Sequence, residues 1–261
     1  MRKRPGYLAA GLFALLMALQ PIAVAAAEIA AFISIGVQSA VEELIPVFEK
    51  ASGHRIVAAW AVAAGLNTRV QDGEVADVLI STRAGIDALI KAGKISAGSD
   101  VELARSGIGL AVRKGAQKPD VSTPEALKRT LLAARAISYS DPAVGGASGV
   151  HFASVLERLG IAAEMKARTR FPPPNGLAGR LLVSGEADLS IQQIPEVAGV
   201  EGIELIGPLP GDLQLITTFV AGIPTTVRQG DAARAFVRFL QSPQAVAVMK
   251  AKGLEVSDQR R

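Results

Sequence analysis

Small polar residues and glycines gather where predicted strands lead into predicted helices. After the first predicted strand, over residues 29–35, the chain carries Ser34, Gly36, Gln38 and Ser39. A helix N-terminus offers unpaired N–H groups and a partial positive charge, so an anion can dock there without a formal cation. This segment therefore predicts an anion-binding loop. The alternative is that Ser39 only caps the helix.

The strongest local signal for ligand contact is the glycine-rich loop at residues 140–149. Ser140 follows a predicted strand, and Ser148 stands where the next helix begins, so it offers both a hydroxyl and a helix cap. Gly149 allows the backbone to approach a ligand closely. Neither GK[ST] nor GxGxxG is present, so the loop is not a nucleotide-phosphate loop. We expect Ser140, Ser148 and Gly149 to contact a ligand.

Other predicted loops supply neutral donors and one cation. Ala64 and Asn67 follow the second predicted strand, Asn175 follows a triple proline, and Gln192 ends a later strand beside a second glutamine. Arg83 follows the third strand, and its planar guanidinium can hold a carboxylate bidentately. We expect these residues to face one ligand site. The alternative for Arg83 is an exposed position on the following helix.

The chain offers no metal or cofactor chemistry that its residue types reveal. It has no cysteine, which excludes disulfides, thiolate metal sites and a cysteine nucleophile. Its two histidines, His54 and His151, lie 97 positions apart. No GxSxG motif occurs, so a serine hydrolase is not indicated either. The prediction is a protein without metal and without cofactor.

The N-terminus has the layout of a secretory signal peptide over residues 1–27. Basic residues 2–4 precede an apolar run at residues 7–19, and small residues end at Ala27, where we predict cleavage. The alternative, a membrane anchor, would need about 20 apolar residues. Without residues 1–27, the 28 basic residues fall to 25 against 24 acidic ones. This balance argues against nucleic acid and against stable membrane insertion, and we expect a periplasmic protein.

Apolar runs of strand length alternate with helical periodicity along the 261 residues, which predicts an α/β fold. In such sheets the loops after the strands share one edge, where ligands bind. The polar loops described above should therefore converge. The predicted strands are 29–35, 55–59, 77–80, 107–113, 136–139, 166–171, 188–192 and 213–220.

Several segments resemble a known family. FEKASGHRI at 48–56, GEVADVLIS at 73–81 and SGEAD at 184–188 resemble type II periplasmic solute-binding proteins of the molybdate-binding family. The resemblance implies a two-lobed fold of the periplasmic binding protein type II class, in which each lobe is a mostly parallel sheet flanked by helices. It places lobe 1 at residues 28–107 and 215–261, and lobe 2 at residues 108–214. It also implies a monomer that captures a small anion between the lobes for an ABC transporter permease.

The resemblance weakens where the ligand is chosen. Molybdate-binding members carry a Gly/Ser-rich turn after the second strand and a tyrosine near the end of lobe 2, whereas this chain has AVAAG at 61–65 and SIQQ at 190–193. Oxyanion and carboxylate ligands therefore both stay open.

Residues 99–122 and 191–210 instead resemble an offshoot of the family that includes aconitate isomerase-like proteins. The alternative function is thus a cofactor-independent isomerase of an unsaturated tricarboxylate. Such an enzyme needs an acid or base and carboxylate anchors. The candidate acids and bases are His151, Tyr139 and Asp141, and the candidate anchors are Arg83 and Arg180.

Overall fold

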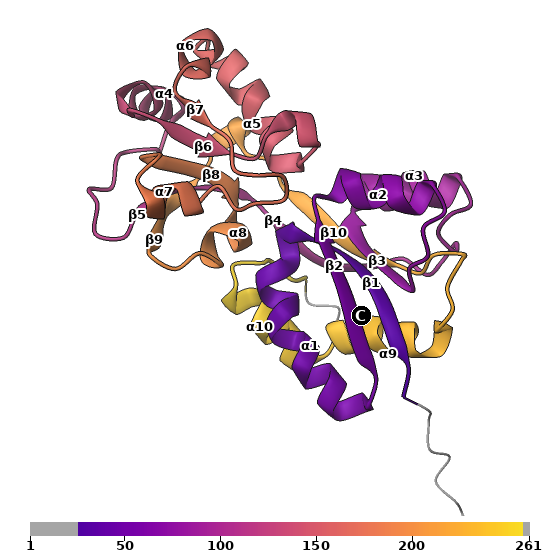
Figure 1. Cartoon of the computed structure of the whole chain (residues 1–261). Helices are drawn as coiled ribbons and strands as arrows, with labels where there is room; N and C mark the ends of the chain where they lie inside the picture. Colours follow the sequence, from indigo (N-terminus) through magenta and orange to yellow (C-terminus); the bar gives the residue numbers. More distant parts are fainter. Residues whose placement is uncertain (1–25, 258–261) are drawn as a thin grey trace, which may run out of the picture.

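The computed structural model describes residues 26–257. All but the last two residues of the predicted signal peptide, residues 1–27, lie outside this range. The chain forms two five-stranded sheets, each flanked by helices, and the two sheets belong to separate lobes (Figure 1). Among the described residues, no helix combines the length and the apolarity that crossing a membrane requires.

The sheet of lobe 1 is covered on both faces because its strands alternate their side chains. Along the first strand, Ile29, Ala31 and Ile33 pack against α1, α9 and α10, whereas Phe32 points to the opposite face, toward α2 and α3. The strand order is β2-β1-β3-β10-β4. The elements are β1 (Glu28–Ser34), η1 (Ile35–Val37), α1 (Gln38–Ser52), β2 (Arg55–Ala61), α2 (Ala63–Gln71), β3 (Val78–Thr82), α3 (Arg83–Lys91), β4 (Val101–Ser106), β10 (Thr217–Gly222), α9 (Gly230–Leu240) and α10 (Pro243–Ala251).

Lobe 2 repeats this arrangement with the strand order β7-β6-β8-β5-β9. The longer helices α4 and α5, together with the short helix α6, cover one face, and the short helices α7 and α8 cover the other. The elements are β5 (Ile108–Arg113), α4 (Pro124–Ala133), β6 (Ile137–Tyr139), η2 (Pro142–Val144), α5 (Ala147–Arg158), α6 (Ala162–Lys166), β7 (Thr169–Arg170), α7 (Arg180–Ser184), β8 (Leu189–Gln193), α8 (Ile194–Ala198), β9 (Ile203–Pro208) and η3 (Gly211–Leu213).

Both sheets are mostly parallel, as predicted. In lobe 1 only β10 opposes its neighbours, and in lobe 2 only β5 does. Each of these two strands follows a segment that crosses between the lobes, through Gly107 before β5 and through residues 214–216 before β10. The Gln214 amide joins the crossing segments, since Oε1 accepts from Ile108 N at 2.8 Å and Nε2 donates to Ile108 O at 2.9 Å.

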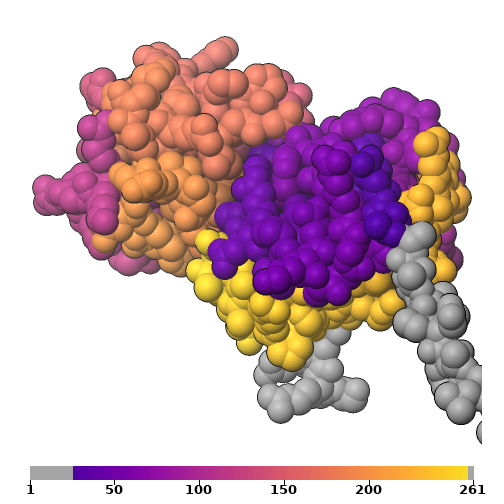
Figure 2. Space-filling view, turned by 60° about the horizontal axis from the view of Figure 1, so that its bottom comes forward, coloured from indigo at the N-terminus to yellow at the C-terminus, as the bar shows by residue number. Residues whose placement is uncertain are grey.

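The C-terminal helices belong to lobe 1 although most of lobe 2 precedes them in the chain. Figure 2 shows the yellow C-terminal segment against the indigo N-terminal segment, with the pink and orange lobe 2 beside them. Two aspartates anchor equivalent points of the lobes, each just before a central strand. Asp77 Oδ2 accepts from Ala30 N at 2.9 Å, and Asp188 Oδ2 accepts from Arg135 N at 2.7 Å.

Two strands escape the sequence prediction, and one predicted strand is wrong in part. β4 and β9 lie at sheet edges, and they carry charged or half-exposed residues in place of a continuous apolar run. Residues 166–171 were expected as a strand, but Lys166 ends α6 and only Thr169 and Arg170 pair with β6. Met165 is buried in the core of lobe 2 as part of α6, so this part of the segment is helical.

Candidate functional site

The two lobes enclose a small cavity whose walls are mostly helix beginnings. Its volume is about 20 Å³, which holds about one water molecule, so a larger ligand requires the lobes to move apart. Five lining residues are N-caps, belonging to η1, α2, α3, α5 and α8: Ser34, Val62, Thr82, Gly146 and Gln193. The other lining residues are Ile35, Gly36, Ala63, Ser140, Ala147, Ser148, Glu196 and Phe219.

The lobe 1 wall is built around close packing at the end of β1. The Ser34 hydroxyl accepts from Gly36 N at 3.3 Å, and Thr82 Oγ1 accepts from Gly85 N at 3.3 Å. A Cβ on Gly36 would stand 2.4 Å from the Phe219 ring, so this position needs glycine. The tight turn thus holds both hydroxyls at the cavity.

The lobe 2 wall places Ser140 and Ser148 at the cavity, 7% and 3% exposed. The Ser148 hydroxyl makes no hydrogen bond within residues 26–257, so it is available to a ligand. A Cβ on Gly149 would stand 2.1 Å from Ser140 O, which explains the glycine. Gln192 lies behind this wall, where its Nε2 donates to Ser140 Oγ at 3.3 Å.

Several contacts cross directly between the lobes. Asn175 Oδ1 accepts from Val62 N at 2.9 Å, and Asn175 holds a left-handed backbone with φ of 61°. Ser39 Oγ donates to Pro195 O at 3.1 Å. These polar contacts fasten the lobes at the rim of the cavity.

The electrostatics of the cavity come from helix ends and one buried acid. None of the described residues that line it is a lysine, arginine or histidine. Converging helix N-termini therefore supply the positive potential. Glu196 is 6% exposed, and its Oε2 has no hydrogen-bond partner in the described part of the chain. Burial raises the pKa of its carboxyl to about 8, against the opposing effect of the Gln193 N–H.

The structure does not bring Arg83 to this cavity. Its guanidinium lies 2.7 Å from Asp100 Oδ2 and 3.4 Å from Asp87 Oδ1. The hydrogen bond with Asp100 raises the pKa of Arg83, and that of Asp100 is lowered in turn. Two acids of lobe 1 thus already engage the expected carboxylate anchor, and Arg83 does not line the cavity.

Ser39, Gly149, Asn175 and Gln192, described above, do not line the cavity either, and neither do three further predicted ligand contacts. Gln38 Nε2 donates to the Glu42 carboxylate at 2.6 Å on an exposed face of α1. Asn67 Oδ1 accepts from Ser81 Oγ at 2.7 Å within lobe 1. Ala64 is exposed at the start of α2 and faces Gly145 of lobe 2.

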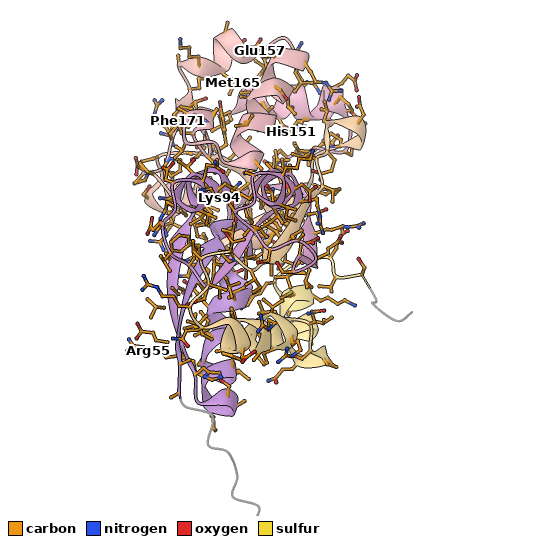
Figure 3. All side chains as sticks on the ribbon, turned by 90° about the vertical axis from the view of Figure 1, so that its right-hand side faces the viewer. Arg55, Lys94, His151, Glu157, Met165 and Phe171 are labelled. Carbon is orange, nitrogen blue, oxygen red and sulfur yellow. The ribbon has the colours of Figure 1, made fainter. Side chains whose placement is uncertain are left out.

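The candidate acids and bases also lie elsewhere. His151 Nε2 is 2.8 Å from Leu213 O, and Figure 3 shows His151 on lobe 2. Tyr139 packs edge-on against Phe152 and Phe171, and burial raises its pKa. These two residues and the remaining candidates do not line the cavity: Asp141 accepts from Ala143 N at 2.9 Å, and Arg180 is exposed at the start of α7.

Thr82, Glu196 and Phe219 line the cavity although the sequence did not predict them as site residues. Glu196 had a usable signal, because Pro195 and Glu196 stand at the second and third positions of α8, after its N-cap Gln193. That pattern predicts a helix start beside Gln192 and Gln193. It does not predict that the Glu196 side chain is buried, since most acidic residues are exposed.

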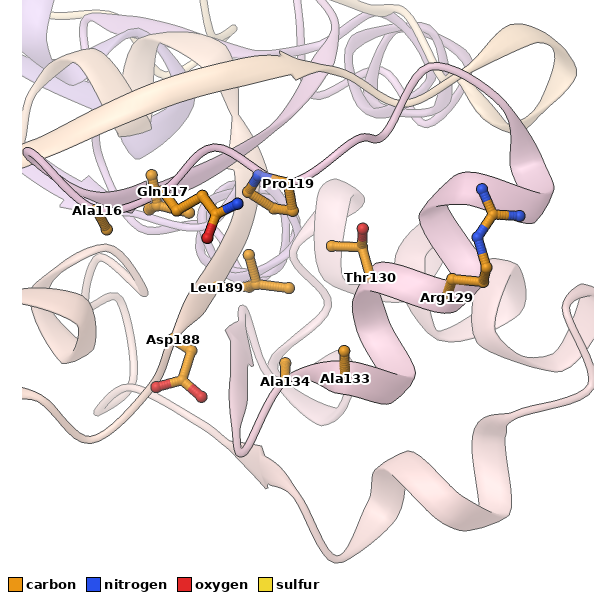
Figure 4. A pocket seen from close by; sticks show the side chains of 10 residues that line it. Ala116, Gln117, Pro119, Arg129, Thr130, Ala133, Ala134, Asp188 and Leu189 are labelled. Atoms are coloured by element: carbon orange, nitrogen blue, oxygen red, sulfur yellow. The ribbon is translucent and has the colours of Figure 1, made fainter.

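A second hollow of about 510 Å³ lies in lobe 2, away from the lobe interface. Figure 4 shows the Arg129 guanidinium and the Asp188 carboxylate at opposite ends of it. Thr130 Oγ1 donates to Asp120 O, and Asp188 is engaged by Arg135. Its polar groups are therefore not directed at a common point.

Comparisons with known proteins agree with this architecture. An aconitate isomerase from Pseudomonas sp is 32% identical over 226 residues, 84% of each chain. The molybdate-binding protein ModA of Azotobacter vinelandii is 27% identical over 234 residues, 87% of this chain and 90% of its own. The solved periplasmic molybdate-binding protein of Azotobacter vinelandii superposes with a TM-score of 0.74 at 20% identity, covering 88% of this chain and all of the other.

The family resemblance expected from the sequence motifs is confirmed. The family model described as bacterial extracellular solute-binding protein matches residues 29–255, nearly everything that the structure describes. The two sheets, the crossing segments and the enclosed cavity agree with that match. This chain belongs to the family of bacterial extracellular solute-binding proteins.

Proposed function

We propose that this protein is exported to the periplasm, captures a small anion between its lobes and delivers it to an ABC-type transporter. The observation that carries the proposal is the convergence of five N-caps on one cavity, which no cationic side chain of the described residues lines. Helix N-termini bind anions through N–H groups and the helix dipole. Opening at the crossing segments would admit the ligand, and closure would exclude water from it.

The ligand class is a compact oxyanion or a carboxylate. Hydroxyls of Ser34, Thr82, Ser140 and Ser148 supply hydrogen bonds that suit either one. Arg83 no longer favours a carboxylate, because Asp100 and Asp87 engage it.

Titration calorimetry with molybdate, sulfate and trans-aconitate tests the binding function. Ser148→Ala should lower the affinity for the anion about tenfold, since the loss of one hydrogen bond to the ligand costs about 1.4 kcal/mol of binding free energy. Ser154→Ala is the matched control on the same helix, because its hydroxyl donates to His151 O away from the cavity. Equal affinities for Ser148→Ala and the unaltered protein would refute this site.

The second candidate function is isomerisation of an unsaturated tricarboxylate. It is favoured by the 32% identity with an aconitate isomerase and by Glu196, the acid among the described cavity residues. An allylic proton shift removes a proton from one carbon and returns one to another, and a carboxyl group with a pKa of about 8 suits both steps. Glu196 replaces His151, Tyr139 and Asp141 as the candidate base.

Proton NMR of trans-aconitate mixed with the protein separates the two candidate functions. New resonances that grow with time support the isomerase, and Glu196→Gln should then abolish growth while binding persists. Broadened resonances without conversion support the binding protein alone.

A further inference from the structure

Glu196 stands out among the cavity residues because its surroundings leave one oxygen without a role in the fold. Its carboxyl accepts a hydrogen bond from Gln193 N–H, yet Oε2 has no partner within residues 26–257. The residue is 6% exposed and lines the cavity. A buried polar atom without a partner is costly, so it indicates a group held for another purpose.

Within residues 26–257, no cation forms an ion pair or hydrogen bond with this carboxyl. The elements packed against α8 are α1, β5, β8, β9 and η1, together with the C-terminal segment at Gly253. β8 and η1 carry no charged residue. Most charged side chains on the other elements are engaged elsewhere: Glu42 with Gln38, Glu43 with Lys252, Glu49 with Ile56 N, Glu204 with Lys118, and Arg113 with the carbonyls of Leu182 and Val183. Lys50 is exposed in the last turn of α1, at the end of the helix away from Ser39, which contacts α8.

A carboxylate here would repel an anion, whereas a carboxylic acid would bind it. Two negative charges in an enclosed site of low dielectric interact strongly, so they cannot share the cavity cheaply. A protonated carboxyl instead provides an O–H donor and no charge. Burial already keeps the Glu196 proton bound near neutral pH.

Resting on the proposed anion-binding function, we propose that Glu196 is a specificity-determining residue that stays protonated and donates its O–H to the captured anion. Capture then holds a proton together with the anion, and linkage requires the two to strengthen each other. Above the pKa of the free site, each bound anion takes up a proton from solution. The protein therefore selects anions that accept a hydrogen bond and releases them as the medium becomes alkaline.

The test is calorimetric titration with molybdate and with trans-aconitate between about pH 6 and pH 10. For the unaltered protein, Kd should be flat below about pH 8 and rise toward tenfold per pH unit above it. Titration near pH 8.5 in buffers of different ionisation enthalpy should show proton uptake on binding. A Kd that does not change across this range would overturn the proposal and leave the proposed function intact.

Variants separate the donor from the charge. Glu196→Gln retains an N–H donor of similar shape, so Kd near pH 7 should stay within about threefold of the unaltered protein, and its alkaline rise and proton uptake should vanish. Glu196→Ala lacks both the donor and the charge, so near pH 7 its Kd should lie about tenfold above that of the unaltered protein, and this Kd should not rise with pH. Glu157→Gln removes an exposed charge from α5 on the outer part of lobe 2 and should keep the full pH profile (Figure 3).

Three results contradict the proposal. An alkaline rise that persists in Glu196→Gln would assign the proton to another group. An alkaline rise lost in Glu157→Gln would mean that the charge of the whole protein causes it. Failure of both anions to bind the unaltered protein would remove the proposed function and this proposal together.

Discussion

The base of the lobe 1 sheet and the interlobe cavity each contain a buried carboxyl group, and the two differ in their hydrogen bonding. Asp77 is 3% exposed and accepts from three backbone N–H groups, those of Ala30, Arg228 and Gln229, at 2.8 to 2.9 Å. Glu196 is 6% exposed, accepts from one N–H and leaves Oε2 without a partner in the described chain.

This difference distinguishes a structural acid from a functional one. Asp77 ties the start of β3 to β1 and to the segment before α9, so both of its oxygens are engaged within the fold. Glu196 ties little together and faces the cavity instead. Buried groups with incomplete hydrogen bonding and a perturbed pKa concentrate at functional sites.

The largest expected effect tests the structural side of the comparison. Asp77→Ala leaves three buried N–H groups without their acceptor, so the free energy of unfolding should fall by about 4 kcal/mol. Asp188→Ala is the matched control in lobe 2, where the aspartate side chain is 40% exposed and water can replace it. It should cost about 1 kcal/mol. Urea unfolding measures both, and equal losses would contradict the distinction.

The next effect tests Glu196 through the dependence of stability on pH. The folded-state pKa of about 8 lies above the ordinary value of 4.5. The stability that Glu196 contributes is therefore complete below about pH 4.5 and is lost as the pH rises through about 8. The slope approaches about 1.4 kcal/mol per pH unit between these values. Glu196→Gln should lack this slope in urea unfolding at pH values across the range, and parallel profiles would contradict it.

The smallest effect concerns the closure of the cavity. Asn175→Gly removes the acceptor of Val62 N but suits the left-handed backbone at this position. The free energy of unfolding should change by less than about 0.5 kcal/mol, whereas anion affinity should fall about fivefold because one closing hydrogen bond is lost. Calorimetry and urea unfolding give the two values. If the free energy of unfolding falls by more than the free energy of anion binding, this contact serves the stability of the fold, as Asp77 does.

The elements that the sequence predicts well are those that local pattern determines. The strand β3 is evident from its apolar run. Ser34 and Ser140 follow strands and Ser148 stands in the first turn of a helix, and the structure places all three serines at the cavity. The ion pair of Arg83 could not be predicted, because Asp100, 17 positions along the chain, reaches it only in the folded lobe. Glu196 was missed because its burial depends on lobe packing, which no local pattern contains.

The chain returns from lobe 2 to lobe 1 to add β10, and this return sets the order in which the two sheets can be completed. All strands of lobe 2 lie between Ile108 and Pro208, so its sheet can close before the rest of the chain is synthesised. Lobe 1 cannot, because β10 separates β3 from β4 and comes last. Until residues 217–222 arrive, β4 has no neighbour and β3 has an open edge that other chains could pair with. The nascent protein is thus most exposed to misassembly in the lobe that is synthesised first.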